Sequence, residues 1–452
     1  MTQPAPASQP SSVKAGALGA AALLGVGLGA LLARKRPIAP EAGSEPNRHS
    51  RVPQLEGTPR RQYYTGPSLD QAAAIADLRA MTHHRLPRFA LEYLEGGAED
   101  EATLTRERDA FADWRFVPRT LVDVSHRTLD THILGKPASA PLMVAPTGLN
   151  GIFRRHADTM LAQGAAKSGV PFIQSTMSND HMDEIAKVPN LRHWWQLYVF
   201  GGDEVWQELL NRADHAGCEA LVLTTNTQIF GNREWEKRTR VKERLTVPSA
   251  INSALHPRWF AETLNHGTPS FVNVIDFVPK DKRSFFESST WIRENQPTSL
   301  SWDTVAKIRD RWKKPFILKG LLNPDDVRRA VDAGVDGVAL GSHGGRQLDW
   351  TVSALDVLPE ARKTVGDRLA LFMSGGIRRG TDILKALSLG ADAVLAGRAP
   401  LYGVCADGAV GVERALDILK KEALDALGLL GAPSLDALGP TLLQPASALP
   451  GR

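Results

Sequence analysis

The sequence contains little cysteine, and charge of neither sign dominates it. Cys218 and Cys405 are the only two cysteines among 452 residues. Two thiols cannot build a disulfide framework, and no ligand residues have metal-site spacing, so we expect no metal and interpret both thiols as small buried hydrophobes. The 54 basic and 50 acidic residues leave a formal net charge of +4. That small excess does not indicate a nucleic-acid-binding protein.

The glycine fingerprint of pyridine-nucleotide enzymes is also missing. No such glycine pattern follows a first predicted strand with an acidic residue downstream. The sequence therefore argues against an NAD-dependent or NADP-dependent dehydrogenase.

Long apolar runs are scarce, and the only one that could span a bilayer covers residues 15–33. It is uncharged and is followed at once by Arg34, Lys35 and Arg36. A membrane helix needs about 20 apolar residues, and basic residues after it favour a cytoplasmic position for the domain that follows. We therefore expect a tail and a single-pass anchor at 1–36, then a linker at 37–67. A cleaved signal, an organellar targeting peptide and a flexible tail are the alternatives.

From about residue 68 the sequence alternates between strand-like and helix-like segments. Two helical segments come first, at 69–86 and 88–104. Eight apolar strand candidates follow, most of them one helix length apart: 141–148, 171–175, 193–199, 220–226, 315–320, 337–342, 369–376 and 393–398. Eight such units predict an α/β fold, a closed (β/α)8 TIM barrel, over residues 68–430 with a tail at 431–452. The long insertion at 227–314, after the fourth strand, is interpreted as a lid or docking segment.

Polar residues end most of these strands. In a (β/α)8 barrel the active site lies at the carboxyl ends of the strands, so these side chains should gather at one mouth. They are Thr147, Ser175, Gln196 with Tyr198, Thr224, Lys319, Ser342 with His343, Ser374 and Arg398.

Two glycine- and arginine-containing loops predict a phosphate site. SGGIRRG (374–380) follows the seventh strand and AGR (396–398) follows the eighth. Glycine lets backbone N–H groups approach an anion, a following helix N-terminus adds a favourable dipole, and Arg378 and Arg398 supply charge. Loops after strands seven and eight commonly hold phosphate in this fold.

The segment GSHGGRQLD (341–349) follows the sixth strand and carries His343 and Arg346 three residues apart. An imidazole with a pKa near neutrality suits proton transfer, and a guanidinium suits capture of a carboxylate. The segment indicates acid–base chemistry on a carboxylate-bearing substrate.

Several ordered motifs resemble the FMN-dependent 2-hydroxy acid dehydrogenases and oxidases, a family that includes lactate and mandelate dehydrogenases. The motifs are YLEGGAEDEATL (93–104), APTGLNG (145–151), WQLYV (195–199), LTTNTQIFGNRE (223–234), LKGL (318–321), SHGGRQLD (342–349) and GGIRRGTDILKALSLGADAVLAGR (375–398). The resemblance covers about residues 68–430. It implies an FMN enzyme that oxidises a small 2-hydroxy acid and passes electrons to a quinone or another carrier.

The resemblance also implies residue roles. His343 matches the catalytic base, Arg233 and Arg346 match the clamp on the substrate carboxylate, and Tyr93 and Tyr198 match the tyrosines that bind substrate. Lys319 matches the lysine beside flavin N1 and the C2 carbonyl, where its charge stabilises the reduced flavin. The residues expected along the flavin ring are Thr147, Gly148, Ser175, Gln196 and Thr224, and those expected along its phosphate-bearing chain are Ser374, Gly375, Gly376, Arg378, Gly397 and Arg398. Gly148, where many oxidases carry alanine, favours a dehydrogenase.

Three positions depart from the family pattern. Asn226 stands where an Asp usually pairs with the catalytic imidazole, Gly341-Ser342 replaces Ser-Asn before the His, and Ser374 replaces an Asp near the flavin ribityl hydroxyls. Loss of the first carboxylate should lower the pKa of His343.

These departures keep other functions open beside the membrane-bound dehydrogenase. One is a peroxide-producing oxidase, a second is a flavoenzyme acting on a larger molecule, and a third is a protein that only binds flavin. The resemblance also implies a homo-oligomer, a tetramer.

Overall fold

The computed structural model describes residues 61–241 and 244–448, all within the compact unit Val52–Arg452. The predicted anchor at 15–33 lies outside the described residues. Within the described ranges, no helix has both the length and the apolar character that crossing a bilayer requires.

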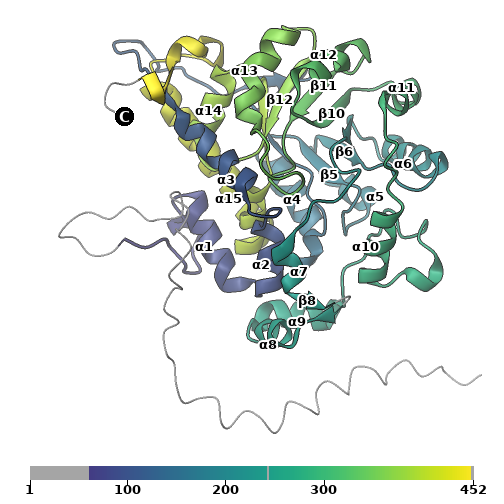
Figure 1. The fold of residues 1–452 in the computed structure, drawn as a ribbon. Helices are drawn as coiled ribbons and strands as arrows, with labels where there is room; N and C mark the ends of the chain where they lie inside the picture. Colours follow the sequence, from purple (N-terminus) through teal and green to yellow (C-terminus); the bar gives the residue numbers. More distant parts are fainter. Residues whose placement is uncertain (1–60, 242–243, 449–452) are drawn as a thin grey trace, which may run out of the picture. The chain divides into compact units, whose positions relative to one another are not determined.

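Eight parallel strands close into a barrel, as the sequence predicts (Figure 1). They are β4 (Leu142–Val144), β5 (Phe172–Ser175), β6 (His193–Leu197), β7 (Ala220–Thr224), β10 (Phe316–Leu321), β11 (Gly337–Leu340), β12 (Ala370–Ser374) and β13 (Ala393–Ala396). The last strand pairs with the first, Val394 opposite Leu142, and this pairing closes the ring. Most of their residues are buried, because parallel strands are covered by side chains inside the barrel and by helices outside.

Helices follow the strands and cover the outside of the barrel. They are α4 (Ala157–Lys167), α5 (Met182–Ile185), α6 (Asp203–His215), α11 (Trp302–Arg311), α12 (Pro324–Asp332), α13 (Ala354–Val365), α14 (Gly380–Ser388) and α15 (Arg398–Leu429). α15 consists of two helical pieces joined at Asp407 and Gly408, whose backbone is not helical. It packs against α1, α4 and α14.

An antiparallel hairpin covers the amino-terminal end of the barrel. Ile133 of β2 (Thr131–Ile133) and Ala138 of β3 (Lys136–Ala138) join the apolar cluster that fills the barrel interior. Arg192, just before β6, donates to the carbonyls of Ile133 at 3.0 Å and of Pro137 at 3.1 Å. This end is therefore filled, and the opposite end remains for a ligand.

The segment before the barrel folds against it. It contains η2 (Leu69–Gln71), α1 (Ile75–Arg85), α2 (Arg88–Glu95), α3 (Ala102–Asp109), η3 (Ala110–Asp113) and β1 (Trp114–Phe116). β1 pairs with β14 (Leu443–Pro445), which is flanked by η6 (Leu435–Ala437), η7 (Pro440–Leu442) and η8 (Ala446–Ala448). Residues 443–445, which we expected to lie in a C-terminal tail, thus form a strand. The domain limits themselves stay a prediction.

The insertion after β7 is mainly helical, which its sequence pattern did not indicate. It contains α7 (Glu234–Arg238), β8 (Arg240–Val241), β9 (Arg244–Leu245), α8 (Val247–Ala254), α9 (Pro257–His266), η5 (Lys280–Lys282) and α10 (Phe285–Glu294). Thr246 and Ser284 cap α8 and α10 by accepting from backbone N–H groups in their first turns. Short η4 (Asn150–Ile152) lies between β4 and α4.

Candidate active site

A cavity of about 570 Å³ opens at the carboxyl ends of the barrel strands. Besides the strand ends, α2, α3, α7 and α10 contribute to its lining. Most of the predicted site residues line it, and the exceptions are Gln196, Thr224 and the strand-end residue Ser342. The structure therefore gathers residues that lie as far apart in sequence as Tyr93 and Arg398.

Gln196 and Thr224 lie one layer behind the lining. The Gln196 side chain accepts from the Ser175 hydroxyl at 3.1 Å and donates to Thr224 Oγ1 at 3.0 Å. Both are buried. They fix the orientation of Ser175, which does line the cavity.

His343 lies in the loop after β11, in a left-handed backbone conformation with a φ of 59°. Its side chain is partly buried, and the buried Nδ1 atom finds no hydrogen-bond partner in the described part of the chain. Burial, followed by the positive charges of Lys319 and Arg233, holds the pKa of His343 well below its usual value. The imidazole is thus neutral at neutral pH and able to accept a proton.

The loop that carries His343 is fixed by the amino-terminal helices. Asp349 accepts from the backbone N–H of Thr103 at 2.7 Å at the start of α3. The carbonyl of Gly345 accepts from Ala98 N–H at 2.8 Å. The motifs at 93–104 and 342–349 thus lie in contact with each other.

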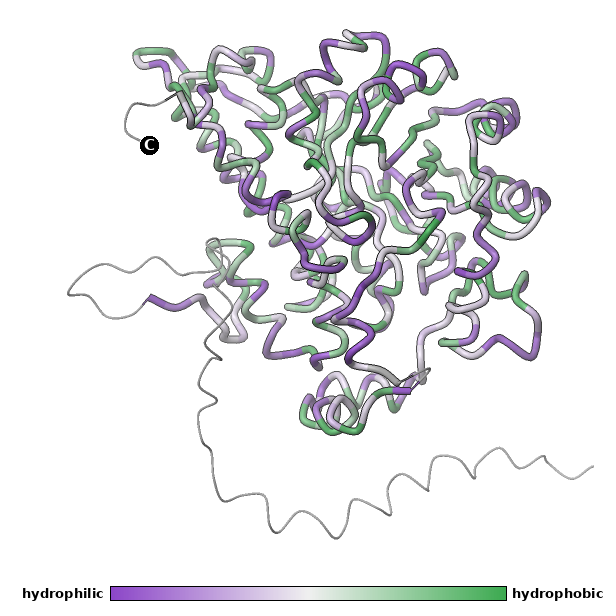
Figure 2. The backbone as a smooth tube through the Cα atoms, in the orientation of Figure 1, coloured by the Kyte–Doolittle hydropathy of each residue, from purple (hydrophilic) through white to green (hydrophobic). Residues whose placement is uncertain are grey.

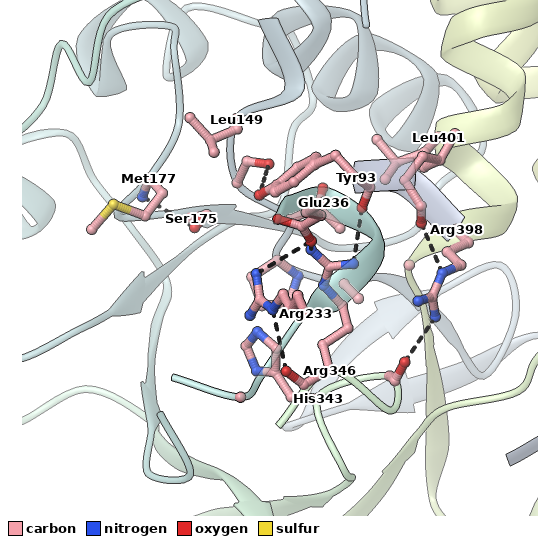
Figure 3. A pocket seen from close by; sticks show the side chains of 18 of the residues that line it. Tyr93, Leu149, Ser175, Met177, Arg233, Glu236, His343, Arg346, Arg398 and Leu401 are labelled. Carbon is pink, nitrogen blue, oxygen red and sulfur yellow. Dashed lines mark hydrogen bonds and ion pairs between the residues drawn. The ribbon is translucent and has the colours of Figure 1, made fainter. Parts of the chain in front are cut away.

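Two guanidinium groups meet above His343 (Figure 3). Arg346 Nη2 lies 2.7 Å from Glu236 Oε1, and Arg233 Nη1 lies 3.9 Å from the same oxygen. Arg233 also donates from Nε to the carbonyl of Arg346 at 3.2 Å. Burial and the neighbouring Arg346 charge lower the pKa of Arg233. The pair therefore already holds one carboxylate.

The two tyrosines predicted to bind substrate lie beside this pair. The Tyr93 hydroxyl donates to the carbonyl of Gly148 at 3.2 Å, and Arg346 lies over the Tyr93 ring at 4.9 Å from its centroid. Burial raises the pKa of Tyr198 well above its usual value. The Tyr198 phenol is consequently a neutral hydrogen-bonding group.

Lys319 of β10 and Glu107 of α3 both line the cavity, and their charges influence each other. Burial lowers the pKa of Lys319 to about 8, against the opposing effect of the Glu107 charge. Burial raises the pKa of Glu107 to about 7. Lys319 therefore still carries most of its positive charge at neutral pH.

The loops after β12 and β13 lie side by side at the cavity. Gly375 and Gly376 have φ angles of 134° and 71°, which other residues rarely adopt. Arg378 lies over the Tyr402 ring, 5.6 Å from its centroid. Arg398 donates to the carbonyls of Leu94 at 2.9 Å and Gly344 at 3.1 Å, and burial lowers its pKa to about 10.

The sequence suggested that the amino terminus of α14 helps to bind a phosphate. In the structure, side-chain carboxylates already accept from the first N–H groups of this helix. Asp382 accepts from the N–H groups of Arg378 and Arg379, both at 2.9 Å, and Glu422 accepts from Gly380 N–H at 2.8 Å. The longer α15 instead begins at Arg398, directly after Gly397, and both residues line the cavity.

Comparisons with known proteins identify the family. The family model described as FMN-dependent dehydrogenase matches residues 82–445. The chain belongs to this family. (S)-mandelate dehydrogenase of Pseudomonas putida is 40% identical over 372 residues, covering 82% of this chain and 93% of that protein. L-lactate dehydrogenase of Caulobacter sp. strain K31 is 35% identical, with coverage of 82% and 98%.

A solved structure agrees with this family assignment of the FMN-dependent dehydrogenase. The crystal structure of monotopic membrane protein (S)-mandelate dehydrogenase matches with a TM-score of 0.78 and 39% identity, over 82% of this chain and 99% of that chain.

The lining residues fit the family's cofactor, FMN. Thr147 Oγ1 and Glu107 Oε2 are buried without a hydrogen-bond partner among the described residues, so the cavity offers polar atoms to a ligand. The glycine loop, Arg378 and Arg398 would hold the phosphate, and Lys319 would lie beside the ring. The role of each residue stays a prediction.

Sequence reasoning missed Glu107 and Glu236, because both come from helices rather than from strand ends. Their spacing could have indicated them. Glu236 lies in α7 three residues after Arg233, the N-cap residue of that helix, and Glu107 continues the buried face that Thr103 begins in α3.

Asn226 lies next to the loop that carries the imidazole. Its amide donates to the carbonyl of Gly341 at 3.1 Å, and its Oδ1 has no partner within the described ranges. The buried imidazole is thus surrounded by cations, without the carboxylate that the family resemblance expects at this position.

We predict that Asn226→Asp raises the pKa of His343, because a nearby carboxylate stabilises the imidazolium. Flavin reduction should become faster, and the acidic limb of its pH profile should move to higher pH. Stopped-flow reduction between pH 5 and 9 measures both. Asn211→Asp, exposed on α6, is the matched control. A slower reaction with an unmoved limb would show that Asn226 is adapted to another substrate.

Proposed function

We propose that this FMN-dependent dehydrogenase oxidises a small 2-hydroxy acid to the 2-oxo acid and passes the electrons to a quinone or another carrier. The observation that carries the proposal is the pair Arg233 and Arg346, which meets one carboxylate oxygen of Glu236 beside a neutral buried imidazole. Planar guanidinium groups bind carboxylates through paired hydrogen bonds, so the site suits a substrate that carries one.

Mandelate and lactate are the first substrates to test, because the relatives named above are dehydrogenases of these acids. Apolar and aromatic side chains from several elements line the same cavity as the arginine pair: Leu149, Phe153, Met177, Phe230 and Phe271. Such a lining favours an acid with an apolar or aromatic substituent.

In this proposal each chain residue has a separate task. Arg233 and Arg346 orient the carboxylate, and the neutral His343 ring accepts a proton from the substrate. FMN supplies the acceptor for the two electrons. Lys319 keeps a buried positive charge that favours negative charge developing near it.

A dehydrogenase is favoured over a peroxide-producing oxidase by Gly148. A Cβ added there would lie 2.7 Å from Met177 Cβ, so alanine would force a shift at the cavity wall. Peroxide formed in air during turnover would instead identify an oxidase. The family resemblance further supports a homo-oligomer, a tetramer, and a catalytic domain at about 68–430, and we keep both as proposals.

We predict that His343→Ala retains FMN and loses flavin bleaching by at least about 100-fold, because general-base catalysis contributes a factor of this order. Anaerobic mixing with mandelate, lactate and glycolate, followed by absorbance, measures the rate. His193→Gln is the control, since His193 is a second buried imidazole, with a pKa lowered to about 4, at the other end of the barrel. Bleaching at the wild-type rate in the His343 variant would remove the base from the proposal.

We also propose that the chain is attached to a membrane, with its catalytic domain on the cytoplasmic side. The solved relative is a monotopic membrane protein, and the run at 15–33 offers a single-pass anchor in this chain. That run lies outside the described residues.

The helices α8 and α9 support attachment independently of the anchor. They carry exposed apolar side chains at Val247 (73% exposed), Ile251, Leu255 (72%), Phe260 and Leu264 (68%). Their hydrophobic stretches are visible along the tube in Figure 2. The exposed basic residues Arg244 and Arg258 belong to the same stretch of sequence and suit an anionic lipid surface.

Removal of residues 1–40 should leave a protein that binds FMN and still sediments, more weakly, with vesicles containing anionic lipid. Adding Ile251→Asp and Leu255→Asp should abolish that residual binding, because charges on the apolar face oppose insertion. The same two changes in the full chain form the reciprocal control. If removal of 1–40 alone abolishes binding, α8 and α9 do not contribute. If it changes nothing, the anchor does not contribute.

A further inference from the structure

Glu107 is a buried carboxylate in the cavity lining with only one of its oxygens occupied. Its Oε1 accepts from the hydroxyl of Ser342, which in turn accepts from Gly345 N–H at 3.0 Å. Its Oε2 finds no donor in residues 61–241 and 244–448. The residue is only 2% exposed, so bulk water does not readily supply that donor. In the ionised form of Glu107 this oxygen is a buried acceptor without a donor, which is costly, so a ligand that donates a hydrogen bond to it would favour that form.

The position of Glu107 indicates which part of a ligand it faces. A Cβ on Gly375 would overlap its carboxylate, and a Cβ on Gly376 would overlap its main-chain carbonyl, so it lies against the glycine loop after β12. The charges of Arg398 and Lys319 both act on it. Glu107 thus lies between the residues assigned to the phosphate and the lysine assigned to the ring.

FMN offers few hydrogen-bond donors to such a carboxylate. Its phosphate is an anion that a carboxylate repels, whereas the ribityl chain between phosphate and ring carries three hydroxyl donors. The residue that should accept from these hydroxyls by family resemblance is an Asp, but this chain has Ser374 there.

We propose that the Glu107 carboxylate binds the ribityl hydroxyls of FMN and takes the place of the carboxylate that is missing at position 374. Ser342, another departure from the family pattern, then orients Glu107 by donating to its second oxygen. The proposal rests on the FMN cofactor of the family and not on the proposed substrate.

The test compares the binding of two flavins to the apoprotein. One is FMN, and the other is an FMN analogue with three hydrogens in place of the ribityl hydroxyls and the phosphate retained. We expect Glu107→Gln to weaken FMN binding roughly 10- to 100-fold, the range for a hydrogen bond to a charged group, and to leave binding of the analogue unchanged. Quenching of flavin fluorescence gives both dissociation constants without any turnover.

Glu422→Gln is the matched control, because Glu422 is a partly buried carboxylate outside the cavity lining and its bond from Gly380 N–H can be kept by glutamine. Equal weakening of FMN and the analogue, or no weakening of either, overturns the proposal. If Glu107→Gln does not fold, Glu107→Asp serves instead. Aspartate keeps the charge but moves the carboxylate oxygens away from the cavity. The ratio of the two dissociation constants, which measures the preference for FMN over the analogue, should therefore be smaller than in the wild type. An unchanged ratio overturns the proposal.

Discussion

Positive charge gathered around a buried imidazole constrains the whole active site. Besides burial, the charges that depress the pKa of His343 come from Lys319, Arg233, Arg346 and Arg398. Like charges repel strongly where water is scarce, so these groups stay together only if the fold holds them and if anions offset them. Glu236 offsets the arginine pair, Glu107 offsets Lys319, and backbone carbonyls receive the donors of Arg398. A site built this way favours ligands that bring a carboxylate and a phosphate.

The scaffold holds the charged groups around His343 in place through two separate sets of contacts. The closed barrel fixes Lys319 on β10, because both neighbouring strands pair with it in parallel register. The loop that carries His343 is not part of a strand, and α3 fixes it instead through Asp349 and the Ser342–Glu107 bond. The amino-terminal helices are therefore part of the active site, although they precede the barrel in sequence.

The fold and most of the lining could be predicted because both depend on local pattern. Buried parallel strands appear as apolar runs, and the residue at a strand's carboxyl end must lie at the mouth, as Ser175 and Lys319 do. The same rule fails for Gln196 and Thr224, because side chains alternate along a strand and a polar residue can support the lining from behind. Glu107 and Glu236 could not be placed by this rule, since tertiary packing decides which helix faces the mouth.

The three departures from the family pattern have one electrostatic consequence when they are considered together. Asn226 and Ser374 remove carboxylates from the ends of β7 and β12, whereas Glu107 supplies one from α3 that bonds to Ser342. Relative to the family pattern, negative charge in the cavity lining is thus kept but comes from α3 instead of from β7 and β12. An imidazole without a carboxylate partner stays neutral over a wide pH range, yet it is a weaker base, because nothing nearby stabilises its protonated form. This distribution of charge favours a substrate whose own groups interact with the imidazolium.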